Sequence, residues 1–392
     1  MLNGKHILLG ISGGIAAYKA PFLVRLLRKE GAQVRCCCTK NALQFLTEVT
    51  LETLSDNEVY TDVFQPHREH QTEHISLPDW ADLMIVAPAT ANFIGKAAGG
   101  IADDALSTTF LAMRKPVLIA PAMNDKMYSH PAVQRNLQVL ESYGNVRVLS
   151  CATGFLACGT TGTGRMQEPE QILQAAQDML TEKTLTGRRV LLTAGPTQER
   201  IDPVRYISNY STGKMGYALA REAQRRGAEV VLVSGPTEEH FDGQIVPVRT
   251  ADEMYDAVMN ELPKADIVIL CAAVSDFKPE QTAEQKIKRS SNDMLLRLAP
   301  TRDIAAAVGK AKTDKQTVIG FALETENEEQ NAIGKLHRKN LDYIVLNSLR
   351  DEGAGFGTDT NKVSIYSPAG LLKSVPLMSK QQVACEILDI LK

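Results

Sequence analysis

The sequence predicts an α/β protein built from two doubly wound domains. Short apolar runs of β character alternate with helix-like stretches along the chain, the pattern of a parallel sheet with helices on both faces. Two glycine-rich turns, GISGG near the start and TAGPTQ in mid-chain, each follow such a run and precede helix-like sequence. At 392 residues the chain exceeds the usual size of one hydrophobic core. We therefore expect domains at 1–184 and 185–392, each with its own phosphorylated ligand.

The first half contains alternating strands and helices that define one edge for a ligand. The expected strands are Ile7–Leu9, Gln33–Cys38, Leu83–Ala87 and Val117–Ala120, and a helix is expected from about Ala16 to Lys29. The strand ends read GISGG, CTKNA, APATAN and APAMN, which are small or polar segments rich in hydrogen-bond donors. Ligands of parallel sheets bind beyond the carboxyl ends of the strands, so we expect a site here.

The second half repeats this architecture after a polar connection that ends at Gly187. Its expected strands are Val190–Thr193, Val230–Val233, Ile267–Cys271, Val318–Phe321 and Tyr343–Asn347. Its expected helices are Gly216–Arg226 and Ala251–Leu262. The charged residues from Arg221 to Arg226 predict a solvated helix face, and Gly227 predicts the end of that helix.

Composition excludes several classes of protein. No apolar run approaches the roughly 18 residues of a membrane-spanning helix, and Gly10 and Ser12 interrupt any signal-peptide pattern, so we expect a cytoplasmic protein. A net charge of −3 and 5% aromatic residues argue against nucleic acid as a partner. The 7 cysteines show no disulfide rhythm, which suits a reducing compartment. Cys36, Cys37 and Cys38 lie in a strand-like segment, and we expect buried thiols there rather than a metal site.

The first glycine turn, GISGGIAAYK, is by itself a weak phosphate-binding signal. It lacks the spacing of the dinucleotide fingerprint, and no acidic ribose ligand follows the second strand, so NAD is disfavoured. Together with the later strand ends it favours a mononucleotide site.

Five motifs of the first half resemble the homo-oligomeric flavin-containing cysteine decarboxylases. They are GISGGIAAYK, EHISL, APATAN, PAMNDKMY and LACG. The resemblance implies that FMN is bound by Ser12, Gly13, Thr39, Thr90 and Asn92. It further implies three roles in catalysis: His74 helps to form the substrate thiolate, Asn124 holds the substrate carboxylate, and Cys158 returns a proton.

The same resemblance explains why a flavin is needed. A carboxylate β to a thiol leaves with difficulty, whereas oxidation of the thiol to a thioaldehyde provides an electron sink for the loss of CO2. A thiol suits the later proton transfer because its pKa can be tuned towards neutrality.

Simpler interpretations compete with each of these roles. A lone His74 is ordinarily a histidine at the edge of the core, Cys158 a buried thiol, and Asn124 the cap of a following helix turn. The glycines around Cys158, including Gly159, Gly162 and Gly164, instead suit a mobile lid. Three positions depart from the family pattern: Thr90 replaces Ser, Tyr128 replaces Trp, and Thr160 replaces Asp.

The segment TAGPTQERIDPVRYISNYSTGKMG resembles the phosphopantothenate-cysteine ligases. Gly195, Ser211, Thr212 and Gly213 offer close approach and donors to a phosphate. STGK lacks the first glycine and the spacing of a P-loop, which argues against a Walker-type ATPase. The resemblance implies that Asn209 handles an acyl-nucleotide intermediate, although turn asparagine is the simpler interpretation.

Later motifs follow in the order of the ligase family and imply a CTP site. Lys286 is expected to contact the transition state, because activating a carboxylate with a triphosphate brings anions together. Mg2+ is expected on the phosphates, with no protein ligands that we can name. Arg302 and Ser348 depart from residues common in the family, Pro and Asp. The residues implied to surround CTP are Ala272, Asp276, Arg302, Asp303, Ile304, Phe321, Lys335 and Lys339. Without the motif context, Lys335 and Lys339 would be read as solvated surface lysines.

Together the two resemblances imply a bifunctional enzyme of coenzyme A biosynthesis. It would ligate 4'-phosphopantothenate to cysteine through an acyl-cytidylate and then decarboxylate the product with FMN. The family implies dodecamers through the flavin domain and dimers through the ligase domain. Two alternatives stay open at this stage: a noncatalytic flavin-binding regulator, disfavoured by the presence of His74 and Cys158, and a flavin prenyltransferase-like enzyme, disfavoured by the attached ligase half.

Overall fold

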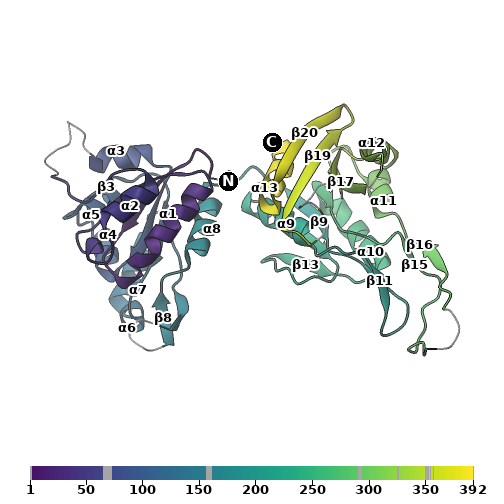
Figure 1. Cartoon of the computed structure of the whole chain (residues 1–392), viewed down its shortest axis with the longest axis horizontal. Helices are drawn as coiled ribbons and strands as arrows, with labels where there is room; N and C mark the ends of the chain where they lie inside the picture. The colour runs from purple at the N-terminus through teal and green to yellow at the C-terminus, as the bar shows by residue number, and fades with distance from the viewer. Residues whose placement is uncertain are drawn as a thin grey trace. The chain divides into compact units, whose positions relative to one another are not determined.

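The computed structural model divides the chain into two compact units, Met1–Thr181 and Glu182–Lys392. It describes residues 2–64, 73–155, 161–289, 294–324, 326–348, 353, 355 and 357–391. Each unit has its own sheet and its own cores, and each is described by itself (Figure 1).

The first unit is built on a parallel sheet with the strand order β3-β2-β1-β4-β5-β6. Its strands are β1 (His6–Ile11), β2 (Gln33–Cys38), β3 (Val59–Tyr60), β4 (Leu83–Ala89), β5 (Val117–Pro121) and β6 (Val146–Val148). The predicted parallel α/β class is confirmed, because all strand pairs of this sheet are parallel. The strands β2 and β4 flank β1, which creates the reversal of strand order at which doubly wound sheets bind ligands.

Helices cover both faces of this sheet, and each face has its own core. On one face are α1 (Ala20–Lys29), α2 (Glu48–Ser55) and α8 (Pro169–Leu180). On the other are α3 (Glu73–Trp80), α4 (Ala91–Ala98), α5 (Ala105–Ala112) and α7 (Pro131–Glu141). Smaller elements are the 3-10 helices Ile15–Lys19 and Ala42–Gln44, α6 (Asp125–Tyr128), and the hairpin β7 (Ala152–Phe155) and β8 (Thr161–Arg165).

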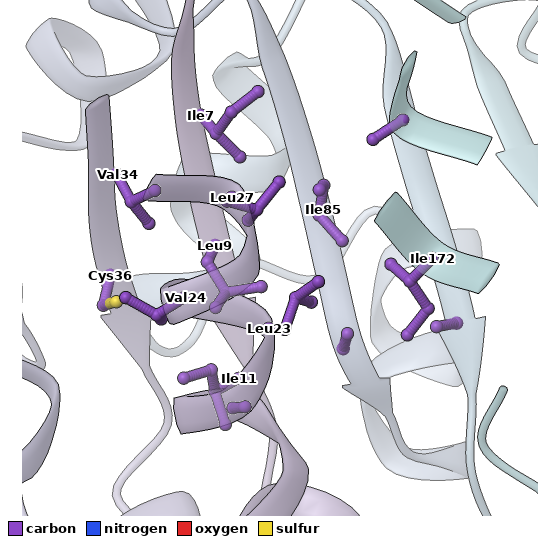
Figure 2. Close-up of a cluster of buried hydrophobic side chains, with 14 of the residues drawn as sticks. Ile7, Leu9, Ile11, Leu23, Val24, Leu27, Val34, Cys36, Ile85 and Ile172 are labelled. Carbon is purple, nitrogen blue, oxygen red and sulfur yellow. The ribbon is translucent and has the colours of Figure 1, made fainter. Parts of the chain in front are cut away.

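The three consecutive cysteines are buried, as expected for a strand in the middle of the unit. Cys36 and Cys38 belong to the core beneath α1, and Cys37 belongs to the core on the opposite face. Figure 2 shows Cys36 among the apolar side chains of the first core, beside Val24 and Val34. Burial raises the pKa of the Cys36 thiol to about 12, so this group stays protonated at neutral pH.

The second unit is built on a larger sheet with the order β13-β12-β9-β14-β17-β18-β19-β20. It is parallel through β18, and the last two strands are antiparallel. The sequence did not predict this antiparallel pair, drawn in yellow in Figure 1. The strands are β9 (Arg189–Ala194), β12 (Glu229–Ser234), β13 (Gln244–Pro247), β14 (Ile267–Leu270), β17 (Thr317–Glu324), β18 (Tyr343–Ser348), β19 (Thr360–Ser367) and β20 (Gly370–Ser379).

Helices again lie on both faces of the second sheet. One face packs against α9 (Lys214–Arg225) and α13 (Lys380–Leu388), and the other against α10 (Ala251–Glu261), α11 (Ile304–Ala311) and α12 (Glu328–Arg338). Smaller elements are two antiparallel ribbons, β10 (Gln198–Arg200) with β11 (Tyr206–Ser208) and β15 (Phe277–Pro279) with β16 (Leu298–Pro300), and the 3-10 helices Leu262–Lys264 and Asp389–Leu391.

The prediction of a solvated face at the end of α9 is wrong for its last arginines. Arg225 and Arg226 are buried, and both donate to Glu222, which is itself only 2% exposed. Arg226 also pairs with Asp389 at 2.8 Å, because α13 and the residues after it pack against α9. Gly227 has φ = 89° and ends the helix, as predicted.

None of the helices in the described part of the chain combines the length and the apolar character that crossing a bilayer requires.

Candidate functional site

Two adjoining pockets lie at the carboxyl ends of the first sheet. The smaller has a volume of about 340 Å³ and the larger about 820 Å³. Both are lined by Gly13, Thr90 and Asn92, so the turns after β1 and β4 separate them. The expected flavin-binding residues therefore converge: Ser12 and Thr39 line the smaller pocket with these three.

Ser12 joins the ends of β1 and β4. Its side chain is buried, donates a hydrogen bond to Pro88 O at 2.8 Å and accepts one from the Thr90 N–H at 2.9 Å. Thr90 in turn caps α4 by accepting the Phe93 N–H. The hydroxyl of Ser12 thus fixes where α4 begins, and the N-terminus of that helix opens at the pocket.

Gly13 allows the first turn to lie against the turn after β2. A Cβ atom at this position would stand 2.4 Å from Asn41 Cβ, so any side chain would push the two turns apart. Thr39 stabilises the second turn, because its hydroxyl accepts the Ala42 N–H.

The charged groups of the smaller pocket were not predicted from the sequence. Lys96 pairs with Asp103 at 2.7 Å and Asp104 at 2.9 Å, and its pKa is raised by these carboxylates. Lys40 pairs with Asp62 at 3.0 Å. No local pattern in the sequence marks these charged residues, because their pairing depends on how the chain folds.

The larger pocket is mostly apolar and brings Asn124 next to the glycine turn. Asn124 accepts the Lys126 N–H at 3.0 Å, so it caps α6 as the simpler interpretation held, and it also lines the pocket. The buried Lys19, which was not predicted from the sequence, lies at the wall and pairs with the half-exposed Glu168 at 2.9 Å. The apolar lining comes from Ile15, Ala16, Tyr18, Ala122, Met123, Met127 and Met166.

The hairpin β7–β8 packs against the turn that carries Asn124. Gly164 O accepts the Met123 N–H at 2.9 Å, and a Cβ at Gly164 would stand only 2.3 Å from Met123 O. Cys158 and Thr160 lie between β7 and β8 in the sequence and are outside the described residues.

His74 does not line either of the two pockets at the strand ends. It lies in the first turn of α3 and is half-buried. Tyr128, which replaces the family's Trp, packs against the core beneath α7 and is compatible with the local fold.

A pocket of about 310 Å³ lies at the corresponding place in the second unit, where β12 and β14 flank β9. It brings together Asn209, Ala272, Asp276, Phe321 and Lys335, which are far apart in the sequence. This convergence is the central feature of the unit, because the residues come from four different elements: Asn209 follows β11, Ala272 and Asp276 follow β14, Phe321 lies in β17 and Lys335 lies on α12.

Asn209 does not act as a local turn asparagine. Its amide donates to Ala273 O at 3.1 Å and Val274 O at 3.2 Å, across 64 and 65 residues of sequence. It therefore fixes the backbone after β14, where Ala272 and Asp276 face the pocket.

Gly216 places the N-terminus of α9 at the strand ends. A Cβ at Gly216 would stand 2.5 Å from Ala194 Cβ, so only glycine lets the helix approach β9 this closely. Ser211, Thr212 and Gly213 precede the helix and line the pocket, as expected for a phosphate-binding turn.

Lys335, on α12, and Lys339, directly after this helix, approach the pocket region. Lys335 donates to Phe321 O at 2.9 Å, and Lys339 pairs with Asp303 at 2.8 Å, while Asp303 also caps α11. Burial lowers the pKa of Lys335, and the neighbouring charge of Lys339 lowers it further. The two ammonium groups are therefore close, although Lys339 and Asp303 are not among the lining residues.

Besides Asp303 and Lys339, three further residues expected at the nucleotide site lie apart from the pocket lining. Lys286 is exposed on the segment after β15. Arg302 turns towards α10, where its guanidinium pairs with Asp252 at 2.9 Å and Asp256 at 2.8 Å and stacks on Tyr255. Ile304 is 6% exposed and packs in the core.

The departure at Ser348 has a local explanation. Its hydroxyl donates to Glu328 Oε1 at 2.7 Å, which ties the end of β18 to the start of α12. A hydroxyl at this position makes the bond to a carboxylate that Asp would repel.

The pocket also contains residues that were not predicted from the sequence. They include two lysines at the starts of α9 and α13, and polar residues at the ends of β18 and β19: Lys214, Lys380, Asn347 and Asn361. Their placement depends on β19, β20 and α13, which pack on the sheet from the far end of the chain.

Within the described ranges, no group of three or more His, Cys, Asp or Glu side chains has the arrangement of a metal site.

Comparisons with known proteins match both units. Residues 1–181 match the Flavoprotein family, and residues 185–392 match the family described as DNA/pantothenate metabolism flavoprotein, C-terminal domain. The chain is 48% identical over 395 aligned positions to the "Coenzyme A biosynthesis bifunctional protein CoaBC" of Bacillus subtilis, covering 99% of this chain and 97% of that protein. It is 44% identical to the protein of the same name from Haemophilus influenzae, covering 99% of this chain and 97% of that one.

Two further comparisons concern a differently named relative and a solved structure. A "Cysteine/Cysteine sulfinic acid decarboxylase" from an unknown prokaryotic organism is 50% identical over 351 positions, covering 88% of this chain and 98% of that protein. The crystal structure of the C-terminal domain of a CoaBC protein is 40% identical, covering 54% of this chain and 96% of that chain, with a TM-score of 0.46.

Proposed function

The chain belongs to the bifunctional proteins of coenzyme A biosynthesis, and on this premise we propose how its two units divide the work. The protein is an enzyme with phosphopantothenate-cysteine ligase and phosphopantothenoylcysteine decarboxylase activities. Residues 185–392 ligate 4'-phosphopantothenate to cysteine with CTP, through an acyl-cytidylate. Residues 1–184 then decarboxylate 4'-phospho-N-pantothenoylcysteine to 4'-phosphopantetheine with FMN.

One observation carries this proposal. In each unit the strand ends around the reversal of strand order converge on a pocket, and each pocket is lined by residues of a family motif. A chain with two such pockets suits two consecutive reactions, in which the product of the ligase is the substrate of the decarboxylase.

The residues of the first unit fit a flavin mononucleotide. The larger pocket offers a broad apolar wall for a flat ring, and the smaller one offers Thr39, Thr90 and the N-terminus of α4 for a polar or anionic end. When bound, the flavin accepts electrons from the substrate thiol and returns them after CO2 has left.

In the decarboxylase unit the chain's own residues orient the substrate and move protons. Asn124 offers its amide to the substrate carboxylate at the wall of the larger pocket, and Cys158 returns a proton to the product. Removal of the thiol proton is assigned to His74 from its motif, although this side chain lines neither pocket. Ser12 and Gly13 hold the strand ends at the spacing that this site needs. Assembly into trimer-based dodecamers remains a prediction.

The proposal for the ligase unit rests on Lys335, Lys339 and the amide of Asn209. Lys335, held by Phe321 O beside Lys339, faces the anionic triphosphate, and Asn209 fixes the backbone that faces the activated carboxylate. The contact with the reacting phosphate is assigned to Lys286 from its motif, although Lys286 is exposed and outside the pocket lining, and Mg2+ would bind to the phosphates of CTP. Dimers through this unit remain a prediction.

A second candidate substrate for the first unit follows from one relative. The 50% identical relative is named for decarboxylation of cysteine or cysteine sulfinic acid. A first unit with the same preference would release CO2 from free cysteine without any nucleotide.

One set of incubations separates these activities. Purified protein is incubated with phosphopantothenate, cysteine and each nucleoside triphosphate in turn, and the product masses are measured. We expect 4'-phosphopantetheine with CTP and a bound flavin spectrum. CO2 release from cysteine alone would favour the second candidate, and a colourless protein that stays inert after addition of FMN would exclude the decarboxylase.

A further inference from the structure

Lys380 is a buried ammonium group at the wall of the second pocket. It is 7% exposed and is the first residue of α13. It donates to Gly355 O at 3.1 Å and Thr358 O at 2.6 Å, and it makes no ion pair with a carboxylate in the described part of the chain. A buried cation hydrogen-bonded only to neutral oxygens is costly unless an anion completes its surroundings.

A second lysine lies beside it. Lys214 is the first residue of α9, lines the same pocket, and pairs with the exposed carboxylate of Asp359 at 2.6 Å. Burial lowers the pKa of Lys380, and the charge of Lys214 lowers it further, so the two ammonium groups lie within electrostatic reach of each other. Asp359 is the carboxylate paired at this corner, while Glu239, which also acts on both lysines, is itself paired with Arg221 at 3.2 Å.

Both lysines occupy helix positions that ordinarily disfavour a cation. The N-terminus of a helix carries partial positive charge, and acidic residues are the usual occupants of the first turn. Neither α9 nor α13 has an acidic residue there, and each begins with lysine instead. Such a local violation is expected where a function requires positive charge.

The corner is separate from the cations assigned to the nucleotide. Lys335 reaches the pocket from α12, on one face of the sheet, whereas α9 and α13 pack on the other face. Lys214, Lys335 and Lys380 are the lysines among the described lining residues. The ligase reaction needs two anionic binding regions, because the triphosphate and the phosphorylated acyl substrate are both bound when the carboxylate is activated.

We propose that Lys380, supported by Lys214 and the backbone at the start of α9, binds the phosphate monoester of the acyl substrate. This assignment rests on the proposed ligase function and adds the residues that select a phosphorylated substrate. Lys380 supplies its remaining N–H to a phosphate oxygen, while its bonds to Gly355 O and Thr358 O hold the segment before β19 against the pocket. The triphosphate stays with Lys335 and Lys339.

The test compares two substrates and two substitutions in the full-length protein. Initial ligase rates are measured with varied phosphopantothenate at saturating CTP, and with varied CTP at saturating phosphopantothenate. We expect Lys380→Met to raise the KM for phosphopantothenate by about tenfold or more, since a hydrogen bond to a charged group contributes roughly that factor. The KM for CTP should stay within about twofold of wild type.

Controls distinguish a phosphate contact from a structural role. Lys380→Arg keeps the charge and should recover most of the affinity, and Lys315→Met removes an exposed lysine and should change neither KM. Methyl phosphate should compete with phosphopantothenate in the wild type and lose potency in Lys214→Met, which provides a test if Lys380→Met does not fold. Turnover of unphosphorylated pantothenate should respond little to the substitutions at Lys380.

Several outcomes would overturn the assignment. They are a rise in the KM for CTP alone, equal losses with pantothenate and phosphopantothenate, or an unchanged KM for phosphopantothenate in a folded Lys380→Met protein. A wild-type protein without ligase activity would instead refute the proposed function, so the two failures are distinguishable.

Discussion

The carboxylate of Asp202 accepts the backbone N–H of Ile287 at 3.1 Å, although 85 residues separate them in the sequence. Asp202 lies in the turn between β10 and β11, and Ile287 follows Lys286. Arg205 completes the contact, because it pairs with Asp202 at 2.7 Å and donates to Ile287 O. The exposed segment that carries Lys286 is therefore anchored by a buried carboxylate.

We predict that Asp202→Asn destabilises the second unit in a pH-dependent way. Burial alone would raise the pKa of Asp202, but the N–H groups of Val204, Ile287 and Arg205 outweigh it and lower the pKa to about 2. A carboxylate with a lowered pKa stabilises the folded state above its unfolded pKa of about 4, and that contribution disappears as the pH falls towards 2. The difference in stability between wild type and Asp202→Asn should be full at pH 7 and shrink below pH 4.

Thermal unfolding by circular dichroism at several pH values measures this difference. The single tryptophan, Trp80, lies in the first unit, so its fluorescence should be the same in both proteins and serves as an internal control. A difference that stayed constant from pH 7 to pH 3 would mean that the charge of Asp202 is not responsible. Ligase activity at pH 7 should also fall in Asp202→Asn, because Lys286 loses its anchor.

We predict that Ser12→Ala weakens flavin binding without a direct contact being required. The substitution leaves the Thr90 N–H without its acceptor in a buried region, which costs about 1–3 kcal/mol. The start of α4 should then shift, and purified Ser12→Ala should retain less flavin, as measured by absorbance after gel filtration. Thr90→Ser, which keeps the capping hydroxyl, should retain flavin at the wild-type level; equal flavin content in all three proteins would contradict this role for Ser12.

The sequence predicted most of the parallel framework, because the strands of both units are short apolar runs bounded by glycine-rich turns. The strand ends at Ser12, Thr90 and Asn124 could be assembled in advance, since parallel strands end at one edge of a sheet. The pair β19–β20 was missed because antiparallel strands of mixed polarity have a weak local pattern. The burial of Arg226 and the position of Lys380 depend on α13, which packs on α9 from the far end of the chain, and no local pattern records such contacts.

The position of Arg302 leads to a prediction that differs from the expectation based on family resemblance. Its guanidinium is bound to Asp252 and Asp256 on α10, so it has a structural role available without a ligand. We expect Arg302→Met to leave the KM for CTP within about threefold of wild type, whereas Lys335→Met should raise it by about tenfold or more. Steady-state kinetics of the two variants, measured in parallel, test this prediction. A tenfold rise in the KM for CTP in Arg302→Met would show that Arg302 acts in the nucleotide site.

Lys335 should give the ligase a dependence on alkaline pH. Burial lowers its pKa below that of an ordinary lysine, and the charge of Lys339 acts in the same direction. The ammonium is present below this pKa and is lost as the pH rises through it, so the KM for CTP should increase at alkaline pH. Lys335→Arg keeps a charge that does not titrate in this range, and its KM should stay flatter between pH 8 and about 10. Identical pH profiles for the two proteins would exclude Lys335 as the titrating group.

Gly164 tests whether the hairpin β7–β8 must lie against the turn of Asn124 for decarboxylation. A methyl group at Gly164 would stand 2.3 Å from Met123 O, a backbone atom that cannot move aside without displacing Asn124. Overpacking of this kind costs about 1–3 kcal/mol, so Gly164→Ala should lower the decarboxylase rate by roughly tenfold or more. Gly154→Ala on the neighbouring strand meets only the flexible end of Arg165 at 3.4 Å and is the matched control. Supplying the cysteine adduct directly and measuring CO2 isolates the first unit, and the ligase rate of both variants should equal that of wild type. A Gly164→Ala protein with an undiminished rate of CO2 release would show that the close contact with Met123 is dispensable.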